Sequence, residues 1–228
     1  MTEAELAELL ADCPRLFHLS AAGSWRTIRR HGLLSTSALL DLFGASGPER
    51  PAVETRRRPG DVALDDPLLG RAVIRDQKPM RDEALRRCLT DGLEPADWYR
   101  LLNRRVFFWL TRERLLKLAL ARSNADREHD VLEIDAASLV ARHRERITLA
   151  AINTGSTLRT PRPRGLATFQ PIDRYPYADW RRKRRRGERV VELAVEGGVP
   201  DIAEVTLRVL RMRRGEVVET IWEHPPPS

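Results

Sequence analysis

Apolar residues recur along the chain at the spacing of short amphipathic helices. Leu6, Leu9 and Leu10 share one side of a helix predicted over residues 3–12, which ends before Pro14 because proline disfavours helix at the preceding residue. The same kind of spacing predicts further helices over residues 37–43, 81–90, 95–103, 111–121 and 138–144. We therefore expect many helices of two to three turns.

Continuous apolar runs and alternating segments predict strands between these helices. The bulky run at 106–110 is typical of a strand buried on both faces. Alternation or apolar runs predict the other strands over residues 16–19, 130–135, 147–152, 189–195, 205–213 and 216–222. Strands mixed with short helices, without regular βαβ spacing, predict a mixed α+β fold rather than a doubly wound sheet.

Two segments lack the regular spacing of apolar residues that is typical of helices and strands. Residues 44–60 are rich in Gly, Pro, Ser, Glu and Arg and predict a mobile surface loop inserted within the domain. Residues 158–189 contain several prolines and a basic run, and are expected to be irregular. We expect a single domain over residues 1–222, followed by a flexible tail over 223–228.

The composition adds a positive charge to this picture. The chain has 228 residues, 42% of them hydrophobic, which suffices for one well-buried core. Its 40 Lys and Arg exceed its 33 Asp and Glu, giving a net charge of +7. Such a charge attracts phosphates, nucleic acid or acidic surfaces, although a generally Arg-rich soluble protein has the same balance.

Several classes of protein are not indicated. Cys13 and Cys88 are far apart and predict buried thiols rather than a disulfide framework or a metal site. The acidic amino terminus does not resemble a signal peptide and no run is long enough to span a membrane, so we expect a cytoplasmic protein without a membrane partner. The Gly-x-Gly-x-x-Gly and Walker A loops are absent.

His18 and Ser20 are the first candidate functional residues. They lie two apart in a predicted strand and therefore share one face. An imidazole beside a hydroxyl suits the hydroxyl groups of a ribose, whereas the alternative is a core histidine bonded to a backbone carbonyl. The next segment can form a helix that Ser24 caps and that Gly32 ends in the left-handed conformation.

Arg75 and Glu192 are candidates of opposite charge. Arg75, near Lys78 and Pro79, offers a planar guanidinium that can clamp a phosphate, or it can pair with Asp76 in a solvated turn. Glu192 lies in an apolar strand, where burial of a carboxylate is costly unless it is paired. It can face a pocket and act on a substrate hydroxyl, or it can face solvent.

The segment before Glu192 offers candidate contacts to nucleic acid. Residues 153–155 read as a turn, with a polar clamp as the alternative. The basic run at 181–186 is either a solvated surface or a nucleic-acid contact. Aromatic neighbours make base stacking available, which favours nucleic acid and gives a predicted nucleic-acid-binding set of Tyr175, Tyr177, Trp180 and Arg182.

Three segments together resemble the ADP-ribosyltransferase superfamily, and within it the DarT-type DNA ADP-ribosyltransferases. They are Phe17-His18-Leu19-Ser20 followed by Trp25, Ile28 and His31-Gly32-Leu33-Leu34-Ser35; Val106-Phe107-Phe108-Trp109; and Val191-Glu192-Leu193-Ala194-Val195 followed by Val199-Pro200 and Ile202. They cover about a third of the chain. The whole chain also resembles an uncharacterised bacterial family, for which fold analogy alone speaks to activity.

The resemblance implies an ADP-ribosyltransferase-like fold and transfer of ADP-ribose from NAD, without a metal, to an acceptor that we expect to be a base of DNA or RNA. By this resemblance, Glu192 matches the catalytic glutamate and Arg75 the basic residue near the nicotinamide or phosphates, with Arg81 as its competitor. His18 would hold the adenosine ribose. The other implied cofactor-binding residues are Ser20, Gly32, Leu33 and Phe108.

The sequence also departs from the family pattern and allows rival functions. Residues 44–60 are rich in Arg and Pro where the family arranges NAD and substrate loops. An RNA 2′-phosphotransferase-like enzyme would begin with a similar histidine but would not need Glu192. A non-enzymatic nucleic-acid-binding module is a further rival, and a soluble domain with a structural His18 and an exposed Glu192 is the last. An antidote protein is a candidate partner, and the sequence defines no oligomeric state.

Overall fold

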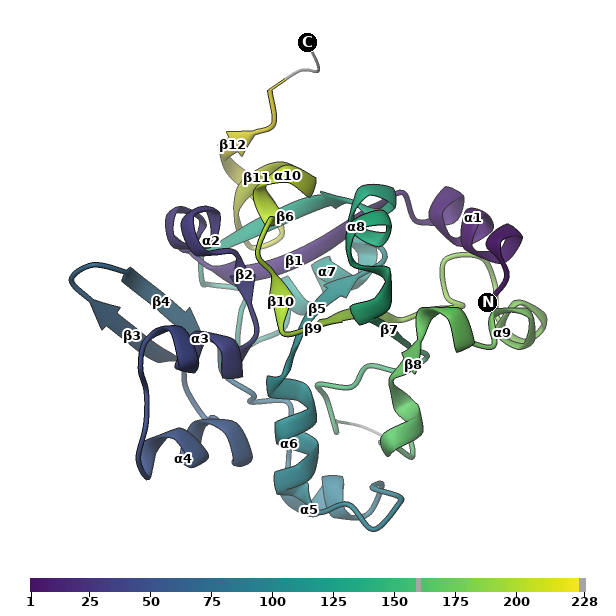
Figure 1. The fold of residues 1–228 in the computed structure, drawn as a ribbon, viewed down its shortest axis with the longest axis horizontal. Coiled ribbons are helices and arrows are strands. Elements are labelled where there is room, and N and C mark those ends of the chain that lie inside the picture. The colour runs from purple at the N-terminus through teal and green to yellow at the C-terminus, as the bar shows by residue number, and fades with distance from the viewer. Residues whose placement is uncertain (159–160, 226–228) are drawn as a thin grey trace.

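The computed structural model describes residues 1–158 and 161–225 and has a mixed α+β fold built on one large sheet (Figure 1). Eight strands follow the order β12-β11-β6-β1-β5-β9-β7-β8, and every neighbouring pair is antiparallel. The strands are β1 (Arg15–Ala21), β5 (Arg105–Trp109), β6 (His129–Asp135), β7 (Ile147–Ala150), β8 (Gln170–Pro171), β9 (Glu192–Glu196), β11 (Thr206–Arg213) and β12 (Glu216–Glu223). The predicted α+β class is confirmed.

Two small antiparallel pairs stand apart from the main sheet. Strand β2 (Leu33–Leu34) pairs with β10 (Gly198–Val199), and so joins the segment after His18 to the segment after Glu192. Strand β3 (Val62–Asp66) pairs with β4 (Gly70–Ile74) in a hairpin that extends to one side of the molecule (Figure 1). The sequence analysis assigned no element to this hairpin.

Helices cover the sheet and connect its strands (Figure 1). The α-helices are α1 (Glu3–Asp12), α2 (Trp25–His31), α3 (Thr36–Leu42), α4 (Glu49–Thr55), α5 (Asp82–Arg86), α6 (Pro95–Asn103), α7 (Arg112–Ala119), α8 (Ala136–His143), α9 (Tyr177–Lys183) and α10 (Ile202–Val205). Short 3₁₀ helices occupy Arg144–Arg146, Leu166–Thr168 and Ile172–Arg174. The predicted helices at 3–12 and 95–103 are confirmed at both ends, whereas the one at 81–90 is shorter than predicted.

The segments predicted to be irregular contain helices that pack against the core. Within 44–60, α4 lies against α6, and Arg58 fixes the chain that follows α4. The Arg58 side chain is 7% exposed, and its Nη1 donates to the carbonyl of Val53 at 2.8 Å and to Oδ1 of Asn103 at 2.9 Å. The segment predicted as a loop therefore contains a surface helix, and a buried arginine anchors the chain after it. Likewise, 158–189 contains α9.

Strand β5 corrects a second expectation. Its exposure alternates, with Val106 and Phe108 buried while Phe107 and Trp109 are half-buried. The strand is therefore not buried equally on both faces. Phe108, fully buried, belongs to the main core, which also receives Leu132 of β6, Leu149 of β7 and helices α1 and α8.

The first helix, α1, and the last strand, β12, lie apart (Figure 1). The predicted tail at 223–228 begins inside β12, whose last residue is Glu223, and residues 226–228 lie outside the described residues. Among the described residues, none of the helices has the length and apolar character that crossing a membrane requires.

Candidate functional site

A cavity of about 550 Å³ opens beside the middle of the large sheet. Its walls come from β1, from α2 to the start of α3, from β4 and the chain after it, from β5, and from the residues around Thr154. Six of the predicted site residues line it: His18, Ser20, Gly32, Leu33, Arg75 and Glu192. The structure therefore brings together residues that are far apart in the sequence.

His18 is held by the backbone of the neighbouring strand. Strands β1 and β5 share only the register pair Phe17–Trp109, and the His18 Nδ1 lies 2.9 Å from the carbonyl oxygen of Phe107. A carbonyl only accepts hydrogen bonds, so Nδ1 carries the hydrogen and Nε2 of a neutral ring is an acceptor. Burial lowers the His18 pKa to about 4, which keeps the ring neutral at pH 7. The two alternatives for His18 are therefore compatible. Nδ1 bonds the backbone carbonyl, as in a core histidine, and Nε2 remains available to a ribose hydroxyl.

Glu192 is the first residue of β9 and is buried, with 4% of its surface exposed. Thr154 holds its carboxylate: the Thr154 hydroxyl donates at 2.6 Å and the Thr154 backbone N–H lies 3.1 and 3.2 Å from the two oxygens. Burial raises the pKa of Glu192 to about 7, against the hydrogen bonds from Thr154 and the charges of Arg164 and Arg114, which lower it. The group is therefore poised to exchange a proton near neutral pH. The alternative of a solvent-facing Glu192 was wrong.

Arg75, rather than Arg81, belongs to the cavity wall. Arg75 follows β4, and its Nη2 donates to Oδ1 of Asn124 at 2.9 Å. Its buried Nε has no hydrogen-bond partner among the described residues. Arg81 instead precedes α5, donates its backbone N–H to the Thr157 hydroxyl, and does not line the cavity.

Gly32 ends α2 with a positive φ of 89°, as the sequence predicted, although its ψ of 164° is extended rather than left-handed helical. A Cβ at this position would lie 2.5 Å from the Cα of Pro200. Only glycine lets the chain after α2 approach the segment after β10 this closely. Ser24 precedes α2 as predicted, but its side chain makes no capping hydrogen bond.

Phe108 does not line the cavity. The residues of β5 that line the cavity are Arg105, Val106, Phe107 and Trp109. Phe108 is fully buried in the core, with its ring 5.8 Å from the ring of His18, which does line the cavity. The sequence resemblance therefore found a strand that lines the cavity but selected a residue that packs against His18 in the core.

The four predicted nucleic-acid-binding residues also lie outside the cavity wall. Tyr175 is buried and donates its hydroxyl hydrogen to the Arg189 carbonyl, and Tyr177 is buried beneath the Arg189 guanidinium. The guanidinium carbon of Arg184 lies 4.2 Å from the centroid of the Trp180 ring. Arg182 is exposed and pairs with Asp179. Their contacts are internal, because α9 folds back on the body of the protein.

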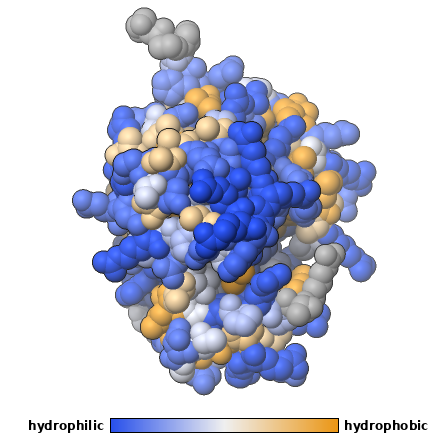
Figure 2. All heavy atoms as spheres, turned by 90° about the vertical axis from the view of Figure 1, so that its right-hand side faces the viewer, coloured by the Kyte–Doolittle hydropathy of each residue, from blue (hydrophilic) through white to orange (hydrophobic). Residues whose placement is uncertain are grey.

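The basic run at 181–186 is partly neutralised by α1. Arg181 pairs with Glu8, Arg186 pairs with Asp12, and Arg189 pairs with both acids. Figure 2 views the molecule from the side where α1 and α9 lie in Figure 1, and this face is largely hydrophilic. Charge counted along the sequence therefore overstates the positive field of this segment.

Sequence reasoning missed residues whose role depends on tertiary contacts. Thr154 was assigned to a turn, with the polar clamp as the alternative, and its clamp on Glu192 becomes visible only when the chain after β7 meets β9. Asn124 carried no signal beyond its type. Its amide oxygen accepts from Arg75, and its backbone carbonyl accepts from His129.

A comparison with protein families matches residues 14–206 to a family of unknown function, DUF7002. The chain belongs to this family. The DUF7002 segment begins just before β1 and ends at the first residue of β11, so it contains His18, Arg75 and Glu192. It leaves out α1 and β12. No curated protein matches the chain.

Proposed function

We propose that this DUF7002 protein is an NAD-dependent ADP-ribosyltransferase that modifies nucleic acid. One observation carries the proposal: His18, Arg75 and Glu192, which the sequence resemblance selected, line a single cavity. The cavity volume of about 550 Å³ lies within the roughly 300–1,000 Å³ of small-molecule and cofactor pockets. Its wall combines apolar residues with polar and charged ones, as a site for a nucleotide requires.

Transfer from NAD breaks the bond between ribose C1′ and the nicotinamide nitrogen. Nicotinamide leaves with the bonding electron pair as a neutral base, and the ribose becomes positively charged and oxocarbenium-like. A fixed carboxylate stabilises that developing charge electrostatically and accepts a hydrogen bond from a ribose hydroxyl. Glu192, fixed by Thr154, is suited to this part because its hydrogen bonds hold the oxygens before substrate arrives.

His18 and Arg75 supply the two other contacts that NAD requires. The neutral His18 ring, with Nδ1 bonded to the Phe107 carbonyl, offers Nε2 as an acceptor for a ribose hydroxyl. Arg75 provides a positive charge for the pyrophosphate. An acceptor nucleophile then forms a bond to C1′ and loses its proton.

The acceptor is proposed to be a nucleic acid because of the net charge of +7. The test is incubation of the protein with NAD labelled in its adenylate part and, separately, single-stranded DNA, duplex DNA, RNA and a cell lysate. We expect one nucleic acid to become labelled by the wild type, with at least a hundredfold lower rate for Glu192→Gln. Glu216→Gln, on the exposed strand β12, makes the same substitution away from the cavity; it is the control and should retain the wild-type rate.

Different outcomes identify the rival functions. Equal labelling of a nucleic acid by wild type and Glu192→Gln would contradict the assigned role of the carboxylate. Adenylate label that appears only in a small-molecule product, while RNA loses its 2′-phosphate and Glu192→Gln stays active, would favour the 2′-phosphotransferase-like reaction. Absence of label in every acceptor, together with nucleic-acid binding that survives loss of His18 and Glu192, would favour a non-enzymatic binding module.

A further inference from the structure

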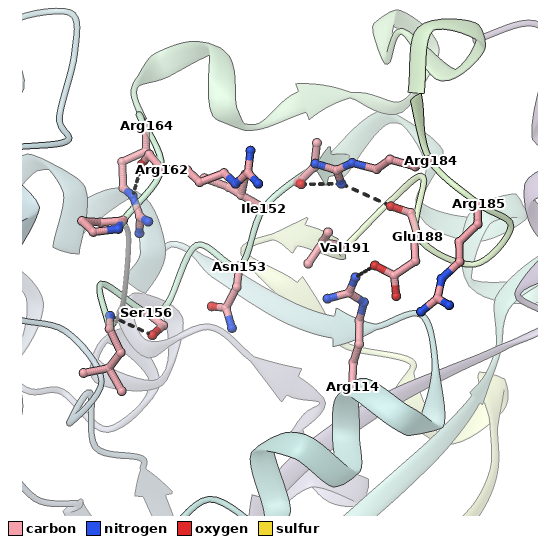
Figure 3. A pocket seen from close by; sticks show the side chains of 13 residues that line it. Arg114, Ile152, Asn153, Ser156, Arg162, Arg164, Arg184, Arg185, Glu188 and Val191 are labelled. Atoms are coloured by element: carbon pink, nitrogen blue, oxygen red, sulfur yellow. Dashed lines mark hydrogen bonds and ion pairs between the residues drawn. The ribbon is translucent and has the colours of Figure 1, made fainter. Parts of the chain in front are cut away.

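A second cavity, of about 560 Å³, lies beside the chain that follows β7 (Figure 3). Three segments line it: residues 151–158, residues 161–164 and residues 184–191, with Arg114 of α7 completing the wall. Figure 3 shows guanidinium groups around the cavity, with Glu188 among them. The function proposed above does not use this cavity.

The lining of this cavity is strongly positive. Among the described residues, it contains five arginines and a single carboxylate, that of Glu188, which pairs with Arg114. The five arginines are Arg114, Arg162, Arg164, Arg184 and Arg185. Like charges gathered in one cavity repel one another, and an anion removes that repulsion. The arginine cavity, as we call it, therefore favours a ligand that carries several negative charges.

Arg164 is the deepest of these cations and is 3% exposed. Its Nη1 donates to the Thr154 carbonyl at 3.0 Å and its Nε to the Arg162 carbonyl at 3.2 Å. Within the described part of the chain, its charge thus meets carbonyl dipoles rather than a carboxylate in direct contact. The charge of Glu192 acts on Arg164 from nearby without direct contact. Burial of the guanidinium is costly, and a bound anion in direct contact would offset that cost.

Two further arginines are positioned to contact a ligand at the cavity rim. Arg162 and Arg185 are exposed. Their neighbours in the basic run are already paired, because Arg181, Arg182 and Arg186 have carboxylate partners. Buried and exposed guanidinium groups in the same cavity can contact successive phosphates of a chain, whereas a single phosphate would occupy only one part of the wall.

The arginine cavity adjoins the cavity that contains Glu192. Arg114, Asn153, Ser156 and Leu158 line both. Thr154 connects the two chemically, because its carbonyl accepts from Arg164 while its N–H and hydroxyl hold Glu192. A ligand bound by the arginines therefore lies next to the carboxylate.

We infer that the arginine cavity binds the phosphodiester backbone of a single nucleic-acid strand and holds that strand beside Glu192. The role of the bound strand as the acceptor rests on the proposed function. Acceptor binding is thereby assigned to Arg162, Arg164 and Arg185. Tyr175, Tyr177 and Trp180 then support the wall from inside the protein.

The test measures binding without NAD, so that it is independent of the transfer reaction. The probes are a fluorescein-labelled single strand of DNA of about ten nucleotides, within the usual range of single-strand binding sites, and the RNA of the same sequence. Fluorescence anisotropy at several salt concentrations is the readout. The double variant Arg162→Ala/Arg185→Ala is compared with Arg181→Ala/Arg182→Ala. The control removes the same charge from exposed arginines that have carboxylate partners.

We expect the cavity variant to bind one of the strands at least about tenfold more weakly than wild type, and the control to bind it less than about threefold more weakly. Two lost phosphate contacts should also reduce the slope of log K against log salt by about 1.4. Equal losses in both variants, or no loss in either, would overturn the inference. So would binding of inorganic phosphate alone, detected as a thermal shift that the cavity variant lacks, without binding of either strand.

The two proposals fail separately. Strand binding that requires Arg162 and Arg185, without any transfer from NAD, would support the binding site and contradict the proposed reaction. Transfer from NAD at the same rate in wild type and the cavity variant would support the reaction and contradict the binding site. Thermal unfolding of both double variants shows whether exposed substitutions leave the fold intact, as we expect.

Discussion

His18 and Glu192 are buried ionisable residues whose pKa values burial moves in opposite directions. The pKa of His18 falls to about 4 and that of Glu192 rises to about 7. In both residues the same cause, the loss of water around the side chain, disfavours the charged form. For Glu192 the consequence reaches neutral pH, where its protonation changes the stability of the folded protein.

The raised pKa of Glu192 sets the direction in which the stability of the folded protein changes with pH. Its stabilising contribution is fully present below its ordinary pKa of 4.5 and is lost as the pH rises through about 7. Glu192→Gln has no proton to lose, so it should become more stable relative to wild type between about pH 5 and about pH 8, by up to about 3 kcal/mol. Urea unfolding at the two pH values measures this change.

Glu216→Gln, on the exposed strand β12, is the control and should show no such change. Titrating groups that the variants share cancel in the comparison. A Glu192→Gln effect of the same size at both pH values would show that the carboxylate titrates below this range.

At the level of residues, the sequence showed which side chains carry functional chemistry better than it showed which residues they contact. An apolar strand with one carboxylate singled out Glu192 because burial of such a group requires an explanation. Its partner Thr154 is 38 residues away, and no local pattern links the two. Phe108 was selected in place of Phe107 and Trp109 because a run of bulky residues does not reveal which of its members reach the cavity and which are enclosed in the core.

At the level of elements, the approach of two loops shapes the cavity. The chain leaves α2 through Gly32 and enters β2, which pairs with β10 just before Pro200. Leu33 and Leu34, the two residues of β2, line the cavity. The close passage of Gly32 over Pro200 therefore fixes one wall of the cavity relative to the segment that follows Glu192.

Gly32→Ala tests this passage against a matched control. Gly23 also has a positive φ, of 82°, but a Cβ there would have nothing within 4 Å, whereas at Gly32 it would lie 2.5 Å from the Pro200 backbone. Both substitutions strain the backbone, and only Gly32→Ala adds a clash, so it should destabilise the fold by about 2 kcal/mol more than Gly23→Ala. Urea unfolding measures both. Equal destabilisation would mean that the loop moves away without cost.

Elements with strong local signals were predicted, and those held by distant contacts were not. The helix at 95–103 has its apolar side, an N-terminal proline and an acidic cap close together in the sequence, and it forms as predicted. Helix α4 has no buried side chains of its own and depends on the contact with α6 and on Arg58, whose partner Asn103 is distant in sequence. Composition alone therefore made this segment look like a loop.

At the scale of the whole molecule, charge is distributed by folding rather than by sequence. The most basic run is partly neutralised by Glu8 and Asp12 of α1, at the other end of the chain. A second group of arginines gathers around the cavity beside Glu192, from separate segments of the chain. The net charge of +7 predicted an affinity for phosphates, but it could not show which arginines share a cavity.

The central claim, that the cavity containing His18, Arg75 and Glu192 holds NAD, is tested most directly by calorimetric titration of NAD into the purified protein. We expect one NAD per chain, an affinity at least about tenfold weaker for His18→Ala, since it loses a buried hydrogen bond to the substrate, and no change for the exposed control His224→Ala. Absence of heat together with an unchanged melting temperature in NAD, or equal affinity in all three proteins, would contradict the account.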